Sequence, residues 1–179
     1  AMKNSSYALV FLTTLLLAAC GFHLRGHSSQ KLELAFQSVY LKVSGETPFV
    51  ADLRTALTFN KVAVSDSAEK ATITLEVISE SSDKQILSLS SAGRVREYQL
   101  RYRVVLRADD SQLVSWLPEE EILLMRTITY DDSQVLAKEQ EEALLFKDMR
   151  SDAVSQAMRR LSRAKPPKPS KDENAPLQR

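Results

Sequence analysis

The sequence predicts an α+β fold, a two-layer sandwich in which two helices pack on one face of a four-stranded, mostly antiparallel sheet. Four segments alternate apolar and polar side chains, as half-buried strands do. Clean alternation also indicates that only one face of the sheet is covered. Two further segments carry apolar residues at helical spacing. The order is strand, helix, three strands and helix, which favours two helices on one sheet face.

The first strand and helix are predicted between residues 38 and 64. Residues 38–43 alternate Val39, Leu41 and Val43 with polar neighbours, which indicates a strand. Thr47 can cap a helix, and Pro48 suits its first position. The apolar stripe of this helix is Phe49, Val50, Leu53, Ala56 and Leu57. Asn60 is predicted to end the helix in the left-handed conformation. Residues 61–64 are predicted only as a short extended piece.

Three longer strands are predicted next. The first begins with Ile73, Leu75 and Val77, and its extended pattern can continue through residues 86–89. Ala92-Gly93 marks a turn. The second has the clearest alternation, with one apolar face made of Tyr98, Leu100, Tyr102, Val104 and Leu106. The third covers residues 121–130.

A long helix is predicted from about residue 134 to residue 161, with Asp131-Asp132-Ser133 as its cap. Glutamates lie in its first half and arginines close it, which complements the helix dipole. Its apolar stripe is predicted to pack on the sheet. This stripe consists of Leu145, Met149, Ala153, Val154, Ala157, Met158 and Leu161.

The start of the chain has the layout of a bacterial lipoprotein export signal. Lys3 precedes an apolar run over residues 7–17, and Ala18-Ala19 stand before Cys20. The run is too short to span a bilayer comfortably. Cys20 is the only cysteine, so no intrachain disulfide can form. We expect Cys20 to carry a diacylglycerol and an N-acyl chain. The alternative is a free thiol within an uncleaved, buried apolar segment.

The predicted organisation has four parts. Residues 1–19 form the signal peptide, and Ala1, which precedes Met2, is expected to be left over from cloning. Residues 20–36 form a lipidated tether, and residues 37–163 form the folded domain. The stretch 164–179 is rich in proline and polar residues and is predicted to be disordered. Gly21, rather than aspartate, follows Cys20, which favours the outer membrane over retention in the inner membrane.

Composition excludes several classes of protein. The formal net charge is +1, and Lys3 is the only charged residue before Cys20, so the mature chain carries no net charge. A nucleic-acid-binding protein normally shows a basic excess. A hydrophobic content of 44% with 26% charged residues is typical of a globular domain. No second long apolar run follows the signal, so the acyl chains are the only membrane attachment expected.

The sequence gives little support for an enzyme. The only histidines, His23 and His27, lie in the tether, where Gly21 and Gly26 disfavour the helix that would align them on a metal. No histidine is available in the domain as a catalytic base. Residues 118–121 contain consecutive glutamates, interpreted as a solvated loop before a strand. A hydrolase using Glu119 and Glu121 stays open as the weakest hypothesis. No metal or other cofactor is expected.

Basic residues are the more promising candidates. Arg94 and Arg96 flank the turn near Gly93. The polar face of the next strand carries Arg101, Arg103 and Arg107, and Lys138 lies early in the long helix. One interpretation is a solvated sheet face with ordinary charge pairing. The other is a surface for an anionic amphiphile or an acidic partner wall, since arginine binds phosphate in a bidentate manner.

Three stretches together resemble the LptE family of lipopolysaccharide-assembly lipoproteins. They are Cys20-Gly21-Phe22-His23-Leu24-Arg25-Gly26, then Arg96-Glu97-Tyr98-Gln99-Leu100, and Tyr130-Asp131-Asp132 with Leu136-Ala137-Lys138-Glu139. The resemblance implies the same sandwich fold. It also implies an outer-membrane lipoprotein that forms a one-to-one complex with the LptD β-barrel, plugs it, assists its assembly and binds lipopolysaccharide.

The resemblance also directs attention to particular residues. Lys138 matches a basic position at the helix start and is the first candidate for contact with lipopolysaccharide phosphates. Arg94 and Arg96 lie near a turn where the family often presents another base, although this chain has Ser90-Ser91 there. Arg101, Arg103 and Arg107 are not a family signature and are expected to face a polar barrel lumen. The alternative function is a freestanding lipopolysaccharide- or lipid-binding lipoprotein without a barrel partner.

Overall fold

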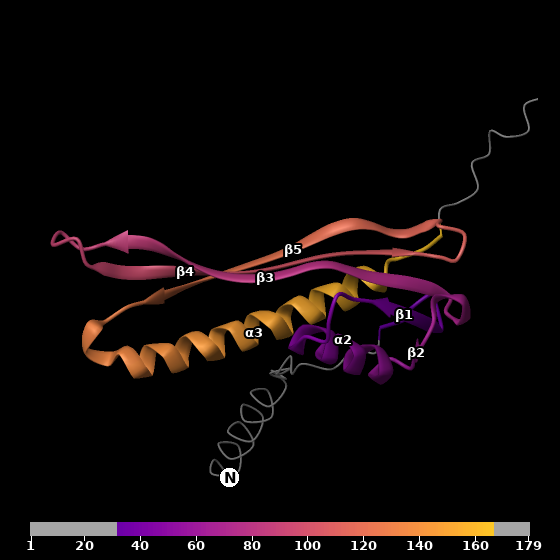
Figure 1. The fold of residues 1–179 in the computed structure, drawn as a ribbon, viewed down its shortest axis with the longest axis horizontal. Coiled ribbons are helices and arrows are strands. Elements are labelled where there is room, and N and C mark those ends of the chain that lie inside the picture. The colour runs from indigo at the N-terminus through magenta and orange to yellow at the C-terminus, as the bar shows by residue number, and fades with distance from the viewer. Residues whose placement is uncertain (1–31, 167–179) are drawn as a thin grey trace, which may run out of the picture. The chain divides into compact units, whose positions relative to one another are not determined.

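The computed structural model describes residues 32–166. The predicted export signal, Cys20, both histidines and the predicted tail from residue 167 lie outside the described residues. Two helices lie on the same side of a five-stranded sheet (Figure 1). The elements are β1 (Ser38–Lys42), α2 (Pro48–Phe59), β2 (Ala63–Ser65), η1 (Ala68–Lys70), β3 (Ile73–Leu89), β4 (Val95–Asp109), β5 (Ser115–Thr129), η2 (Asp132–Gln134) and α3 (Val135–Leu161).

The α+β class and the placement of the helices agree with the prediction, but the predicted four-stranded, mostly antiparallel sheet is wrong in detail. The strand order is β2-β1-β3-β4-β5, and β1 pairs in parallel with both β2 and β3. The fifth strand, β2, has three residues, which is too short for a pattern of alternation to reveal it. Helix α2 carries the chain back across the sheet, which makes the β1–β2 pair parallel.

The start of α2 confirms the prediction, and its end corrects it. Thr47 is the N-cap and accepts a hydrogen bond from Val50 N, while Pro48 is the first helical residue. Asn60 has φ −85° and is not left-handed; Lys61 takes that conformation, with φ 64°. The Asn60 amide is used differently, since its Nδ2 donates to Ala56 O at 2.8 Å and its Oδ1 accepts from Leu32 N at 2.9 Å.

The long hairpin of β3 and β4 contains a bulge that changes which residues of β3 face the helices. Val77 pairs with Leu106, but Glu80 pairs with Val104, with a register shift between Val77 and Ser79. Directly opposite residues share a face. Beyond the bulge, polar residues therefore occupy the helix-facing positions, namely Glu80, Ser82 and Lys84. The hairpin turns at Gly93, whose φ of +73° favours glycine.

Strand β5 begins at Ser115, six residues earlier than the sequence predicts, so residues 118–121 lie in a strand and not in a loop. Pro118 is tolerated because β5 is an edge strand of the sheet. Glu120 and Glu121 pair with different arginines, Arg160 at 2.9 Å and Arg103 at 2.7 Å. Glu119 and Glu121, the two carboxylates of the hydrolase hypothesis, therefore lie in a strand, and Glu121 is held in an ion pair.

The predicted cap of the long helix forms in two stages. The Asp131 carboxylate accepts hydrogen bonds from Ser133 N at 2.9 Å and Ser133 Oγ at 2.7 Å. Both hydrogen bonds hold the pKa of Asp131 below its ordinary value, and the bond from the Ser133 hydroxyl is the larger cause. The short 3₁₀ turn η2 follows, and α3 then begins at Val135. The predicted stripe is buried from Met149 to Leu161.

One hydrophobic core lies between the sheet and the helices. Its largest buried side chains include Phe49, Leu53, Ile73, Leu100 and Met149. Phe36 and Ala164 are also buried, so packing involves residues just outside the predicted limits of 37 and 163. Arg150 of α3 pairs with Asp52 of α2 at 3.0 Å, which ties the two helices together. Among residues 32–166, no helix is both long and apolar enough to cross a membrane.

Candidate functional site

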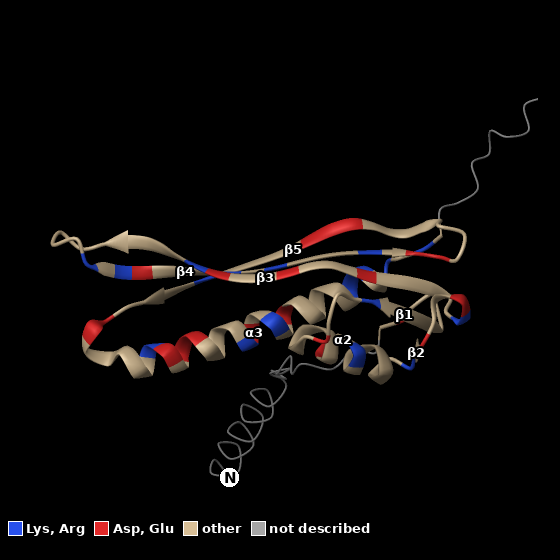
Figure 2. Ribbon diagram, in the orientation of Figure 1, with Lys and Arg blue, Asp and Glu red and all other residues tan. Residues whose placement is uncertain are grey.

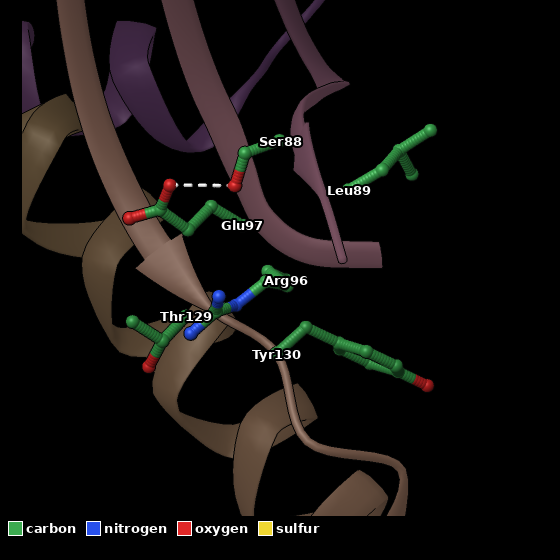
Figure 3. Close-up of a pocket in the computed structure, with 6 residues that line it drawn as sticks. All are labelled: Ser88, Leu89, Arg96, Glu97, Thr129 and Tyr130. Carbon is green, nitrogen blue, oxygen red and sulfur yellow. Dashed lines mark hydrogen bonds between the residues drawn. The ribbon is translucent and has the colours of Figure 1, made fainter. Parts of the chain in front are cut away.

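The candidate site lies at the end of the domain where β3 turns into β4, β5 ends and α3 begins (Figure 1). We call this the distal end. A surface pocket of about 350 Å³ opens there. Its lining comes from three strands and the residue after β5, namely Ser88, Leu89, Arg96, Glu97, Thr129 and Tyr130 (Figure 3). The pocket depends on the long strands ending together, so it is a product of the tertiary fold.

Arg96 is the basic residue of the pocket lining. Figure 3 shows its guanidinium on the Thr129 side, while the neighbouring Glu97 points toward Ser88. The Glu97 carboxylate accepts a hydrogen bond from Ser88 Oγ at 2.6 Å. Tyr130 N donates to Arg96 O at 2.8 Å and fixes the backbone there. Within residues 32–166, no carboxylate forms an ion pair with Arg96, so its five donors are available to an anion.

Lys138 approaches the same place from α3. Its Nζ donates to Thr129 Oγ1 at 3.1 Å and to Glu141 Oε2 at 2.8 Å. Its side chain is 18% exposed, a low value for a lysine. Lys138 is the fourth residue of α3, where the helix dipole disfavours a cation. Thr129 therefore lies next to both cations in the site, since it lines the pocket with Arg96 and hydrogen-bonds to Lys138.

An aromatic and cationic cluster stands beside the pocket. The Tyr98 and Tyr130 rings meet edge to face with centroids 5.4 Å apart. Lys84 Nζ lies 4.8 Å from the centroid of the Tyr98 ring and 2.7 Å from Glu142 Oε2. The hydrogen bond to Glu142 raises the pKa of Lys84 above its ordinary value, against the effect of burial. This cluster connects β3 and β4 to the first half of α3.

Large apolar side chains are exposed at the distal end. Leu89 lines the pocket and is 55% exposed, and Leu136 at the start of α3 is 70% exposed. Ile86 and Leu87, from the end of β3, are also exposed. Apolar groups beside cations are what a ligand with an anionic head and an apolar body would contact.

The structure places two of the three predicted lipopolysaccharide-binding residues at the distal end around Thr129. Arg96 lines the pocket with Thr129, and Lys138 hydrogen-bonds to Thr129 without lining the pocket, whereas Arg94 lies in the turn and does not line it. Arg94 instead uses its backbone, with N donating to Ser90 Oγ at 3.1 Å. The sequence did not reveal Thr129 as a site residue. Its position at the strand end, directly before Tyr130-Asp131-Asp132, is the only signal it carries.

The predicted arginine ladder lies on the sheet face away from the helices and is paired with acids. Arg101, Arg103 and Arg107 form ion pairs with Asp83 at 3.0 Å, Glu121 at 2.7 Å and Glu76 at 2.7 Å. Figure 2 shows acidic and basic segments side by side along β3, β4 and β5. Ordinary charge pairing thus occurs at all three arginines, and neither sign dominates this face.

The structure is that of a small α+β domain whose distal end places basic residues beside exposed apolar side chains. The model of the family "LptE: Lipopolysaccharide-assembly" matches residues 34–161. The chain therefore belongs to the LptE family of lipopolysaccharide-assembly lipoproteins, which is not a family of enzymes.

Individual relatives agree with this assignment. The chain is 31% identical over 157 residues to the LPS-assembly lipoprotein LptE of Yersinia pestis, covering 86% of this chain and 73% of the relative. It is 29% identical to the protein of the same name from Pectobacterium atrosepticum, covering 89% and 86%. Among solved structures, an uncharacterized lipoprotein B from Nitrosomonas europaea aligns with a TM-score of 0.67 and 38% identity, covering 79% of this chain and 90% of that one.

Proposed function

We propose that this protein is an outer-membrane lipoprotein that plugs the LptD β-barrel, assists its assembly and binds lipopolysaccharide as that lipid is inserted into the outer leaflet. Membership of the LptE family supports the general role in lipopolysaccharide assembly. Beyond this general role, we propose the lipid-binding residues, the barrel partner and the lipid anchor at Cys20.

The observation that carries the lipid-binding part is that Arg96 lines the distal pocket with Thr129, to which Lys138 hydrogen-bonds. Lipopolysaccharide presents phosphates next to acyl chains. The planar Arg96 guanidinium suits a phosphate with two parallel hydrogen bonds, and the Lys138 ammonium acts as a point charge. The exposed Leu89 and Leu136 offer apolar contact to the rest of the lipid. Arg94, in the adjacent turn, is within the same end of the domain and adds to the positive potential.

The sheet face away from the helices supports the plug part of the proposal. Barrel interiors of this kind are polar. A face of paired charges can dock against mixed charges without stripping water from isolated ions. We propose that Arg101, Arg103 and Arg107 contact the barrel lumen from this face. Their acidic partners, on β3 and β5, keep the local net charge small.

Reversal of the charge at Lys138 tests the lipid-binding part. We expect Lys138→Glu to weaken lipopolysaccharide binding by about tenfold or more, because an attractive contact with phosphate becomes repulsive. Binding of labelled lipopolysaccharide to the purified lipidated protein measures this. The matched control is Lys147→Glu, since Lys147 is an exposed lysine of the same helix that forms no ion pair within residues 32–166.

The fold and the barrel association should survive both substitutions. Equal binding by Lys138→Glu and Lys147→Glu would remove Lys138 from the site. The second candidate function, a freestanding lipid binder, is favoured by one observation: the pocket and both cations belong to this chain alone. That function predicts equal lipopolysaccharide binding with and without a barrel partner.

A further inference from the structure

We infer that Glu141 is an internal counter-ion of the distal site, which competes with the anionic ligand for Lys138 and thereby limits the affinity. This inference rests on the proposed function, because it concerns the regulation of the same site. Glu141, an acidic residue, thus has a role beside the basic residues of the site. A carrier that must pass on its lipid benefits from such a limit.

Glu141 takes up part of the hydrogen-bonding capacity of Lys138 that an anionic ligand would need. An ammonium group has three hydrogen-bond donors. Within the described residues, Lys138 directs one donor to Thr129 at 3.1 Å and one to Glu141 at 2.8 Å. One donor remains for a ligand while both contacts persist. A phosphate would also be attracted by the positive charge of Lys138, but the Glu141 carboxylate already neutralises that charge.

The two partners of Lys138 differ in how easily they can be displaced. Lys138 is 18% exposed and is held against Thr129 at the end of β5, whereas Glu141 is 49% exposed. Exposed ion pairs between neighbouring helical turns contribute little free energy, because water solvates the released carboxylate well. An incoming phosphate can therefore replace the Glu141 carboxylate while Lys138 stays where it is.

Three other acids at the distal end have their own partners. Glu142 binds Lys84 at 2.7 Å, Glu97 accepts from Ser88 at 2.6 Å, and Asp131 accepts from Ser133. Glu139 is exposed and forms no ion pair within residues 32–166. Among the described residues, Glu141 is the carboxylate that forms an ion pair with Lys138, whereas Asp131 interacts with it through charge at longer range. Glu139 is the matched control for Glu141.

The test compares binding of fluorescently labelled lipopolysaccharide to the detergent-purified lipidated protein and five variants at fixed ionic strength. Glu141→Gln should bind about two- to fivefold more tightly, the size expected for loss of a competing surface ion pair. Glu141→Ala should give the same gain. Glu139→Gln should not change the affinity, although it removes the same charge from the same helix. Lys138→Met/Glu141→Gln should bind no more tightly than Lys138→Met alone.

The outcomes separate this inference from the proposed function. Unchanged or weaker binding by both Glu141 variants, together with weaker binding by Lys138→Met, overturns the inference and leaves the lipid site in place. An equal gain from Glu139→Gln also overturns it, because the effect would then be general electrostatics. Unchanged binding by Lys138→Met overturns the lipid site itself, and the inference with it. Far-ultraviolet circular dichroism verifies the fold of each variant.

Discussion

At the scale of single residues, charge partners decide what each ionisable side chain can do. Glu76 on β3 bridges two cations, with Lys42 Nζ at 2.9 Å and Arg107 Nη2 at 2.7 Å. Arg96 has no such partner within the described residues, and Lys138 has one that is exposed. Basic residues therefore stabilise the sheet where acids pair with them, and are available to a ligand where such pairing is absent or exposed.

The pairing of Glu76 predicts how stability depends on pH. The hydrogen bond from Lys42, followed by the interactions with Arg107, lowers the pKa of Glu76 below its ordinary value of 4.5. A lowered folded-state pKa gives stability that is fully present above the ordinary pKa and is lost as the pH falls through the lowered one. We expect the difference in unfolding free energy between the parent and Glu76→Gln to shrink from about pH 6 to about pH 3.

Urea unfolding at several pH values measures that difference. At the higher pH the parent should be the more stable protein, because Glu76→Gln leaves Lys42 and Arg107 without their shared carboxylate. A difference that stays constant over this range would show that the ionised Glu76 carboxylate does not stabilise the fold.

At the scale of elements, a polar junction connects α2 to the long hairpin. The Glu80 carboxylate accepts one hydrogen bond from Tyr102 Oη at 2.5 Å and another from Thr47 Oγ1 at 2.5 Å. Burial and the Glu80 bond raise the pKa of the Tyr102 hydroxyl far above its usual range. Thr47 also caps α2, so one carboxylate fixes the helix start against β3 and β4. The bulge in β3 makes this possible by turning Glu80 inward.

Removal of one hydroxyl tests the junction. Tyr102→Phe should lower the unfolding free energy by about 1–3 kcal/mol, the usual cost of losing a hydrogen bond to a charged group, here the partly buried Glu80. Tyr40→Phe is the control, because Tyr40 is a partly exposed tyrosine of β1 without a side-chain hydrogen bond within residues 32–166. The midpoint of urea unfolding at an unchanged m-value reports the loss. Equal midpoints for the two variants would contradict a stabilising role for the Tyr102–Glu80 bond.

Elements with strong local patterns were predictable, and those set by tertiary pairing were not. The face of β4 that carries Leu100, Val104 and Leu106 follows from alternation because its two faces differ sharply. The bulge after Val77 has no local signal, since Ile78 reads as one more strand residue. The sequence predicts Asn60 in the left-handed position because asparagine tolerates that conformation, but the Asn60 amide instead accepts a hydrogen bond from Leu32 N.

The candidate site was predictable only in part for the same reason. Lys138 and Arg96 stand out in the sequence as basic residues at a helix start and near a turn, and the family resemblance makes Lys138 the first candidate. Their positions on either side of Thr129 depend on where β5 ends relative to the start of α3, which no local pattern encodes. The competing role of Glu141 has a weak local signal, the spacing of three residues from Lys138 on a helix.

At the scale of the whole molecule, the domain is polarised along its long hairpin. One end gathers α2, β1 and β2, and the turn between β3 and β4 lies at the other (Figure 1). That distal end presents the pocket, the cations Arg96 and Lys138, and exposed leucines. The sheet face between them carries paired charges (Figure 2). This arrangement suits a plug that lies against a polar barrel wall and offers its distal end to a passing lipid.

The most direct test of the plug proposal is purification of the tagged, lipidated protein from detergent-solubilised outer membranes, with mass spectrometry of whatever accompanies it. We predict one large β-barrel protein at a ratio near one to one, retained by the Lys138→Glu variant as well. Recovery of the protein alone in several detergents would contradict the plug proposal and favour a freestanding lipid-binding lipoprotein.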